Sequence, residues 1–371
     1  MTDDTFNLGD AIKKALEAAA KERGHANILI VGKTGVGKST LINTVFEGRI
    51  AETGQGRPVT QHMKRYSKEG LPVSIYDTKG LEVKDYKPIL KELMDKIREL
   101  NRSERPEEHI HVGWVCIAEG ARRVEDAEIE LANALHEQNI PVIVVITTAV
   151  SDQGFKEEVE SHFHMARNVV RVNSLPYEMD EGMVAPIKGV DTLVDVTMEV
   201  IPAGQKNAFS AAQRIKLEHK VTRSRIAVGT AAAAAAGLGA VPVPFSDAVG
   251  IIPIQISMLA TISAFFGIDV TKGFLTTLVG GTFASLSGTM AGRALVGGFL
   301  KLIPGAGSIV GGLISGGVAA TLTTAFGEAY IAVLKKLMTD NPDQTPSVSD
   351  ITDALKEKLK NTNPLQLVHS S

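Results

Sequence analysis

This sequence has a single cysteine, a small net charge and no apolar stretch at its start, and each of these features argues against a class of protein. Among 371 residues there is one cysteine, Cys116, so the chain has no internal disulfide and fits a reducing compartment. A net charge of −3 argues against a protein that coats nucleic acid, and no nucleic-acid partner is expected. Residues 1–7 are polar and acidic where a secretory signal would need an apolar stretch, which favours a cytoplasmic location.

Charged side chains are nearly absent from one long region. Residues 226–327 contain only five of the 39 basic and 42 acidic side chains of the chain, but 19 of its 35 glycines. This contrast predicts two main domains with shorter segments around them. The expected division is an N-terminal amphipathic helix (1–25), a polar α/β domain (26–201), a basic linker helix (202–225), a hydrophobic helical domain (226–338) and a polar tail (339–371).

Short apolar runs rich in β-branched residues alternate with helical patterns through the polar domain. Such alternation is typical of an α/β domain with a doubly wound, mostly parallel sheet, whose ligand lies at the C-terminal ends of the strands. We expect this fold to be followed by an all-α, Gly/Ala-rich hydrophobic helical domain. The expected strands are 26–31, 71–76, 110–117, 141–147 and 168–172, and the expected helices are 6–23, one from residue 39, 88–100, 123–138, 155–165 and 192–200.

A glycine-rich segment between the first strand and the next helix has the pattern Gly-x-x-x-x-Gly-Lys-Ser. In such a loop the glycines let backbone N–H groups turn toward phosphate oxygens, at a helix N-terminus that also favours anions. The lysine reaches the β- and γ-phosphates, and the serine hydroxyl binds Mg²⁺. The expected phosphate-binding residues are Gly32, Lys33, Thr34, Gly35, Val36, Gly37, Lys38, Ser39 and Thr40.

Two further candidates lie downstream of this loop. Asp77 directly follows an expected strand and begins an Asp-x-x-Gly pattern that ends at Gly80. Its carboxylate can hold Mg²⁺ through water, and the Gly80 N–H can sense a γ-phosphate. Thr60, between the two motifs, can add a hydroxyl to the metal while a triphosphate is bound. The expected metal-binding residues are therefore Ser39, Thr60 and Asp77, and Lys38, Thr60 and Gly80 are expected to serve the chemical step.

These motifs carry a resemblance to a known family. Residues 27–81 resemble the G domain of the Era-like, translation-factor-related GTPases through segments 32–39, 58–60 and 77–80, and the form Gly-Lys-Thr-Gly-Val-Gly-Lys-Ser-Thr is also similar to septin, chloroplast-import and immunity-related GTPases. The resemblance implies binding of GTP and GDP with Mg²⁺ and slow hydrolysis. It also implies two switch loops, around residues 47–62 and 78–87.

The sequence departs from that family where the base should be read. The family's Asn/Thr-Lys-x-Asp motif should follow the strand 141–147, but Val150 stands in place of the aspartate that accepts hydrogen bonds from guanine. Asp152 either takes over this role in a bulged loop or caps the helix that begins near residue 155. The other expected base contacts, by the same resemblance, are Thr147, Thr148, Asn173 and Ser174.

A second departure concerns the attacking water. Leu81 stands where many GTPases carry a glutamine that orients the water. Gly35 also replaces the asparagine of potassium-activated Era-like members. Both changes predict slow intrinsic hydrolysis unless a partner or a second protomer supplies a group. Arg122 and Arg123 are conceivable as such a group, although arginines at a helix start are more often surface residues.

The apolar region has two interpretations. Its uncharged stretches 248–268, 273–292 and 302–327 reach the ~20 residues of a membrane span, and a basic segment precedes them, as in proteins attracted to anionic lipid. Membrane association through inserted hairpins or peripheral docking fits this pattern as well as full spans do. The alternative is a tightly packed helical bundle, because prolines, glycines and hydroxyl residues dilute the hydrophobicity. Segments 241–247, 254–258 and 303–307 resemble the hydrophobic domain of unknown function found behind bacterial Era-like G domains, which implies a bacterial source and membrane association.

Together these patterns predict a GTP-binding switch at the inner face of the cell membrane. Its nucleotide state is expected to change its contact with membrane lipid or its self-assembly as a homodimer or larger oligomer. The alternative is a membrane-linked scaffold with a degenerate pocket, relaxed base specificity and no significant turnover. Val150 and Leu81 favour the scaffold, whereas the intact phosphate and magnesium residues favour the switch.

Overall fold

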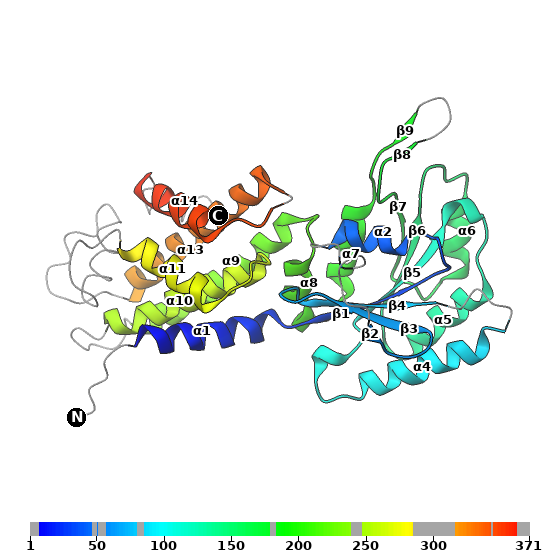
Figure 1. The fold of residues 1–371 in the computed structure, drawn as a ribbon, viewed down its shortest axis with the longest axis horizontal. Helices are drawn as coiled ribbons and strands as arrows, with labels where there is room; N and C mark the ends of the chain where they lie inside the picture. Colours follow the sequence, from blue (N-terminus) through cyan, green and yellow to red (C-terminus); the bar gives the residue numbers. More distant parts are fainter. Residues whose placement is uncertain are drawn as a thin grey trace. The chain divides into compact units, whose positions relative to one another are not determined.

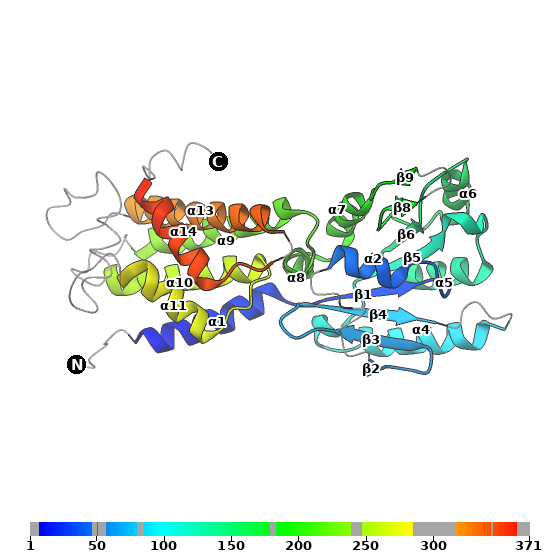
Figure 2. The same cartoon turned by 45° about the horizontal axis from the view of Figure 1, so that its top comes forward.

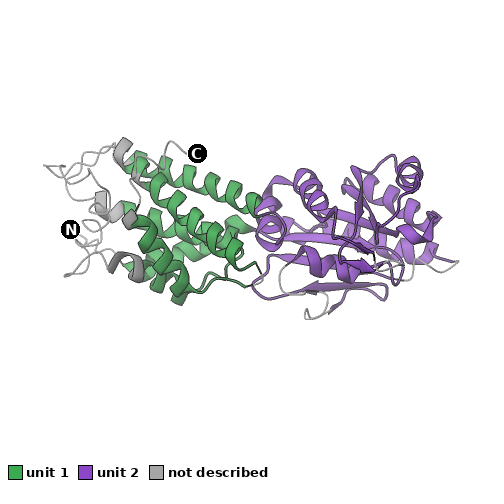
Figure 3. Ribbon diagram, turned by 90° about the horizontal axis from the view of Figure 1, so that it is seen from above, with its two compact units in different colours: residues 1–23, 217–371 green, residues 24–216 purple. Residues whose placement is uncertain are grey.

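A computed structural model of the chain describes residues 7–46, 50, 57–79, 85–178, 183–238, 247–284, 316–342 and 344–361. The chain forms two compact units, which we describe separately: residues 24–216 make a sheet unit, and residues 1–23 with 217–371 make a helical unit (Figure 3). The N-terminal helix therefore belongs to the same unit as the hydrophobic region, although the whole sheet unit separates them in the sequence.

The sheet unit is built on a seven-stranded, mostly parallel sheet with the order β2-β3-β4-β1-β5-β6-β7 (Figure 1). All five strands expected from apolar runs are present, and they run parallel. The sequence analysis missed β2 and β3, an antiparallel edge whose largely polar residues form no apolar run. The strands are β1 (Ala26–Val31), β2 (Arg57–Pro58), β3 (Met63–Ser67), β4 (Val73–Thr78), β5 (Val112–Ala118), β6 (Val142–Thr147) and β7 (Asn168–Val172).

Helices cover both faces of this sheet (Figure 2). One buried cluster joins the sheet to α2 (Lys38–Val45), α7 (Val190–Val200) and α8 (Lys206–Ala212). A second cluster joins the opposite face to α4 (Lys87–Asn101), α5 (Asp126–Glu137) and α6 (Phe155–His162). The doubly wound α/β fold is therefore confirmed. Short 3-10 helices and a two-stranded hairpin complete the unit: η1 (Pro106–Glu108), η2 (Glu119–Ala121), η4 (Ala203–Gln205), β8 (Tyr177–Glu178) and β9 (Val184–Ala185).

The helical unit is all-α in its described part. Its helices are α1 (Leu8–Arg23), α9 (Leu217–Leu238), α10 (Asp247–Phe265), α11 (Lys272–Ala284), α13 (Gly316–Asp340) and α14 (Val348–Asn361). In Figures 1 and 2, α1 lies along α10 and α13 lies along α9. The apolar face of α1 enters the buried cluster of this unit through Ile12, Ala15 and Ala19. The amphipathic pattern at the start of the chain thus reflects packing against α10.

Membrane spans were one interpretation of the apolar stretches. Across the part of the chain that the structure describes, no helix combines the length and the hydropathy that a bilayer crossing requires. Much of the predicted segments 273–292 and 302–327 lies outside the described residues.

The basic segment expected as one linker helix over 202–225 is divided in the structure. The turn η4 and helix α8 belong to the sheet unit, and α9 begins the helical unit at Leu217. The fully buried side chain of Gln213 stabilises the break between α8 and α9, because it donates to the carbonyl oxygen of Lys216 and accepts from the Lys216 N–H. Several of the basic side chains have intramolecular partners: Lys220 donates to the carbonyl oxygen of Phe266 at 3.0 Å, and Arg225 pairs with Glu328 at 3.2 Å.

Candidate functional site

The predicted phosphate-binding loop connects β1 to α2 and depends on glycine at two positions. A Cβ on Gly32, whose φ is 146°, would stand 2.4 Å from the carbonyl oxygen of Cys116 in β5. Gly37 has a φ of 92° and directly precedes α2. Any other residue would strain the backbone at both positions. The loop therefore turns sharply and leads straight into a helix N-terminus, the arrangement that favours a bound phosphate.

Lys38, the first residue of α2, places its ammonium group inside this loop. It donates to the carbonyl oxygens of Gly32 at 2.6 Å and Lys33 at 3.0 Å. Its Nζ is also 3.9 Å from Oδ1 of Asp77, and only 11% of its side chain is exposed. The expected phosphate lysine is thus held at the loop by neutral carbonyl groups that a phosphate could replace.

Asp77 stands near the end of β4, in register with Ile30 of β1. Its Oδ1 is buried and has no hydrogen-bond partner among the described residues. Burial raises the pKa of its carboxyl, and the nearby Lys38 ammonium partly opposes this effect. Because a buried carboxylate oxygen without a donor is costly, the site fits a hydrated Mg²⁺ ion beside Ser39, which follows Lys38 in the first turn of α2.

Thr60 lies in the turn between β2 and β3, and residues of this turn contact α4. Its hydroxyl accepts from the N–H of His62 at 3.1 Å. Glu92 of α4 accepts from the N–H of Gln61 at 3.2 Å and contacts Nδ1 of His62 at 2.8 Å. The turn that carries Thr60 is therefore attached to α4. Gly80 lies outside the described residues, as do Leu81 and residues 47–49, 51–56 and 82–84 of the two expected switch loops.

The loop after β6 holds the residues expected to read the base. Thr147 donates its hydroxyl to the carbonyl oxygen of Val36 at 2.6 Å, which ties this loop to the phosphate-binding loop. Thr148 is exposed and has a left-handed backbone, with φ of 52°. Oδ1 of Asp152 accepts from the N–H of Lys156 in the first turn of α6 at 2.9 Å, and Oδ2 is 3.5 Å from Arg171. The N-cap of α6 is Gly154, so Asp152 bonds the first turn of this helix from two residues before the cap.

The segment after β7 was also expected to contact the base. The Asn173 amide donates to the carbonyl oxygens of Ala185 at 3.2 Å and Pro186 at 2.9 Å, and thereby holds the segment that follows the β8–β9 hairpin. The carbonyl oxygen of Ser174 accepts from the Thr44 hydroxyl of α2 at 3.1 Å. Both residues are almost fully buried, so the structure shows them as supports of the loops around the site.

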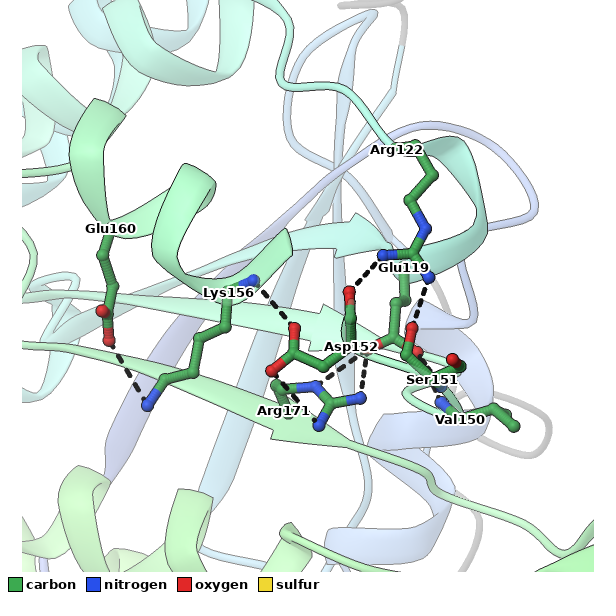
Figure 4. Close-up of polar contacts among 8 residues, drawn as sticks. All are labelled: Glu119, Arg122, Val150, Ser151, Asp152, Lys156, Glu160 and Arg171. Carbon is green, nitrogen blue, oxygen red and sulfur yellow. Dashed lines mark hydrogen bonds and ion pairs between the residues drawn. The ribbon is translucent and has the colours of Figure 1, made fainter. Parts of the chain in front are cut away.

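Sequence reasoning missed several charged residues that surround these loops. Glu119, which is buried, and Arg171, which is partly buried, form an ion pair under the loop after β6 (Figure 4). Arg122, considered above as a donor in trans, donates to the carbonyl oxygens of Ser151 and Asp152. Two sequence features could have indicated the pair of Glu119 and Arg171: Glu119 is an acid directly after a buried strand, and Arg171 is a single arginine inside the apolar run of β7.

Another such contact anchors the phosphate-binding loop itself. Lys33 pairs with Glu125 at 2.5 Å, and Glu125 also pairs with Arg123 at 2.7 Å. Glu125 is the N-cap of α5, where it forms a capping box with Glu128. Lys33 therefore fastens the loop to the start of α5, and Arg123 has a partner within the chain.

Comparisons with known proteins cover both units of the chain. Residues 27–148 match the family described as 50S ribosome-binding GTPase, and residues 205–361 match a domain of unknown function, DUF697. GTPase Era of Vibrio vulnificus is 25% identical over 196 residues, 52% of this chain and 57% of Era. GTPase Der of Wolinella succinogenes is 33% identical over 128 residues, 34% of this chain and 26% of Der.

A similar solved structure is Era in complex with MgGDPNP and a fragment of 16S ribosomal RNA. It is 20% identical to this chain, with a TM-score of 0.30, over 48% of this chain and 57% of that one. The chain thus spans a little more than half the length of the Era proteins that it matches.

Proposed function

Because residues 27–148 belong to a P-loop GTPase family and a DUF697 domain follows them, we propose that the chain binds GTP and GDP with Mg²⁺ and hydrolyses GTP slowly, as a molecular switch. The observation that carries the proposal is the position of Lys38 at the start of α2, where its Nζ lies 3.9 Å from the unpartnered Oδ1 of Asp77 near the end of β4. A cation and a carboxylate oxygen without a donor, placed beside a glycine loop, suit a polyphosphate bound together with a divalent metal.

Each of these residues has a defined part in the proposed reaction. Lys38 would exchange its two carbonyl acceptors for β- and γ-phosphate oxygens, and Ser39 and Asp77 would hold the metal, directly or through water. Bound Mg²⁺ would neutralise the charge that develops on the phosphate oxygens. Thr60 would add its hydroxyl once its turn is released from Glu92. Hydrolysis is slow in this proposal because Leu81 cannot polarise a water molecule.

The test compares GTP binding and turnover by the full chain with two lysine variants. Lys38→Ala should abolish turnover and weaken binding of GTP·Mg²⁺ by about 100-fold, since it removes the charge that contacts the phosphates. The matched control is Lys96→Ala, which removes a lysine on α4 that pairs with Glu99. It should leave both quantities unchanged. Turnover by wild-type protein no faster than that of Lys38→Ala would contradict the proposed GTPase activity.

A second candidate function is a membrane-linked scaffold with relaxed base specificity and no turnover. Its support is the loop after β6, where Val150 has no carboxylate and the Asp152 carboxylate contacts α6 and Arg171. Binding of GTP, XTP and ATP with similar affinity, together with no hydrolysis, would favour the scaffold. A clear preference for GTP together with hydrolysis would favour the switch.

For either function, we propose that the helical unit passes the signal to membrane lipid at the inner face of the cell membrane, or to a second copy of the chain. The apolar composition of residues 226–327 and the basic segment before them support this proposal. Flotation with anionic liposomes and light scattering, each with GDP and with a non-hydrolysable GTP analogue, separate the two partners. The RNA in the Era complex is a feature of that protein, and no nucleic-acid partner is proposed for this chain.

A further inference from the structure

Charged side chains from three neighbouring strand ends meet at the loop after β6 (Figure 4). Glu119 directly follows β5, Arg171 lies in β7, and residues 148–154 connect β6 to α6. The sheet register pairs Ala118 with Thr147 and Ile146 with Arg171, so all three segments reach the C-terminal edge of the sheet together. We call residues 148–154 the base loop, because they occupy the place at which the proposed nucleotide would present its base.

Glu119 holds this base loop from beneath. Its side chain is only 3% exposed. One carboxylate oxygen accepts from the backbone N–H groups of Val150 and Ser151, each at 2.6 Å. The other accepts from Nε and Nη2 of Arg171, at 2.8 and 2.5 Å. A buried carboxylate is tolerated only when such donors surround it, so the charge of Glu119 and the position of the loop depend on each other.

Arg122 holds the same loop from outside. Its guanidinium donates to the carbonyl oxygens of Ser151 and Asp152 and lies over the ring of Phe155, 5.7 Å from the ring centre. Three non-glycine residues in this region have left-handed backbones with φ near 50°: Arg122, Thr148 and Gln153. Such backbones persist where surrounding contacts fix them, and they are often found at ligand sites. Contacts from Glu119 and Arg122 therefore fix the backbone of the base loop.

Asp152 has little freedom to recognise the base. Its two carboxylate oxygens contact the Lys156 N–H and Arg171, and the aspartate position of the family motif is Val150. The side chains of the base loop thus offer no free carboxylate to guanine, and its backbone and shape must carry the contact. Any residue that fixes this backbone then controls how well the base fits.

We propose that Glu119 and Arg171 are positioning residues that hold the base loop in the shape that receives the nucleotide base. This inference rests on the proposed nucleotide binding and adds residues that the family motifs do not include. Neither side chain touches the nucleotide in this proposal; both act through the backbone of Val150 and Ser151. The phosphate-binding loop lies between β1 and α2, and its tie to Thr147 is made at the end of β6, outside the base loop, so its grip on phosphates should depend little on this pair.

The test measures the affinities of full-length protein for GTP and for inorganic tripolyphosphate, both with Mg²⁺, by calorimetry. Tripolyphosphate has no base and reports on the phosphate-binding loop alone. Glu119→Gln keeps the shape of the side chain but loses its charge and one acceptor oxygen. It should weaken GTP binding by about tenfold and leave tripolyphosphate binding within about twofold. Arg171→Gln should act similarly, and the double variant should lose little more than either single one, because the two residues act as one pair.

The matched control is Arg122→Ala, which removes the exposed support of the same loop. It should weaken GTP binding by less than Glu119→Gln does. Hydrogen exchange provides a measurement that does not need a ligand: the amides of Val150 and Ser151 should exchange slowly in wild-type protein and at least tenfold faster in Glu119→Gln. The rest of the sheet should be unchanged.

The possible failures can be told apart. If wild-type protein binds GTP and Glu119→Gln binds it equally well, the positioning role is wrong and the proposed function stands. Equal weakening of GTP and tripolyphosphate binding would show general destabilisation and would also overturn the inference. If wild-type protein binds neither ligand, the proposed function and the inference both fail.

Discussion

The two units of the chain differ in the buried polar groups that link their elements, although the helical unit also buries a charged side chain, Lys220. The sheet unit places charged groups at one edge of its sheet, where Glu119 meets Arg171 and Lys38 approaches Asp77. In the described core of the helical unit, neutral pairs link α10 to α13: Gln255 donates to Thr323 at 2.7 Å, and Ser263 contacts the Tyr330 hydroxyl at 2.7 Å.

This difference follows from what each unit has to do. A neutral pair such as Ser263 with Tyr330 fixes how two helices align and needs no ligand to complete it, whereas Oε1 of Gln255 is buried without a partner among the described residues. A carboxylate oxygen that is buried without a donor, such as Oδ1 of Asp77, costs stability until a cation or donor arrives. The sheet unit is therefore built to gain stability from a ligand, and the described part of the helical unit is built to keep one arrangement. The predictions below test this contrast, from the largest effect to the smallest.

Gly32→Ala should damage ligand binding severely and leave the helical unit intact. The added Cβ would meet the carbonyl oxygen of Cys116, which is part of the β5 backbone and cannot move aside. The phosphate-binding loop would have to shift, and GTP affinity should fall by about 1000-fold, or ~4 kcal/mol. Calorimetry with GTP·Mg²⁺ measures the loss. Gly120→Ala is the control, because a Cβ there meets nothing within 4 Å; an equal loss in that variant would contradict the steric explanation.

Acid should destabilise the sheet unit through His111. Nδ1 of this buried residue accepts from the N–H of Asn27 at 2.8 Å, so Nε2 carries the proton and donates to the carbonyl oxygen of Pro106 at 2.8 Å. Burial lowers the pKa of His111 from 6.5 to about 4. The unfolded chain therefore binds a proton first as the pH falls. The contribution of His111 to the free energy of unfolding is fully present above pH 6.5. It is lost as the pH falls toward 4, which lowers the free energy of unfolding by up to about 3 kcal/mol.

Urea unfolding at several pH values, followed by fluorescence, measures this loss. The single tryptophan, Trp114, is buried in β5 and reports on the sheet unit alone. Burial also raises the pKa of Glu128 to about 6, which adds a contribution of the opposite sign: stability that is present below pH 4.5 and lost as the pH rises to 6. His111→Gln is therefore the control. If it leaves the slope between pH 6.5 and 4 unchanged, another group is responsible.

The sequence predicted the features that depend on local pattern. Apolar runs identify β1, β4, β5, β6 and β7, and the glycine and lysine spacing identifies the phosphate-binding loop. The contacts between distant segments leave no such pattern. Glu119 and Arg171 are 52 residues apart, and only the strand order brings them together. Asp152 bonds the Lys156 N–H of α6 from a position before the N-cap, Gly154, and the sequence could not choose between its two predicted roles because both use the same carboxylate.

The N-terminal helix shows the same limit in the other unit. Its amphipathic pattern predicts a helix at residues 6–23, and the structure has one at Leu8–Arg23. The pattern says that one face is buried but does not name the partner. The buried face packs on α10, more than 200 residues later in the chain.

Gly327→Ala should destabilise the helical unit alone. A Cβ at this position in α13 would stand 2.5 Å from Cγ2 of Val228 in α9 and 3.1 Å from Sδ of Met258 in α10. Overpacking of this kind lowers the free energy of unfolding by about 1–3 kcal/mol. The higher helix propensity of alanine offsets up to ~1 kcal/mol of this loss. Far-UV circular dichroism should show earlier unfolding, while Trp114 fluorescence should not change. In a Val228→Ala background the penalty should disappear, and a penalty that persists there would contradict the predicted clash.

Tyr330→Phe should have the smallest effect, confined to the helical unit. Ser263 contacts both the Tyr330 hydroxyl and the carbonyl oxygen of Leu259, each at 2.7 Å. Since Ser263 donates to Leu259, Tyr330 donates to Ser263, and the variant removes one buried hydrogen bond but leaves Ser263 with its acceptor. The free energy of unfolding should therefore fall by only about 1 kcal/mol.

Tyr86→Phe is the matched control for this last change. The Tyr86 hydroxyl donates to Glu130 at 2.9 Å on the exposed surface of the sheet unit, where water can replace it, so its loss should cost clearly less than the loss of the Tyr330 hydroxyl. Denaturant unfolding followed by far-UV circular dichroism compares the two variants. Equal effects would mean that the pair between Ser263 and Tyr330 adds no more than a surface contact. The alignment of α10 with α13 would then rest on apolar packing, and the contrast between the two units would lose one of its two neutral pairs.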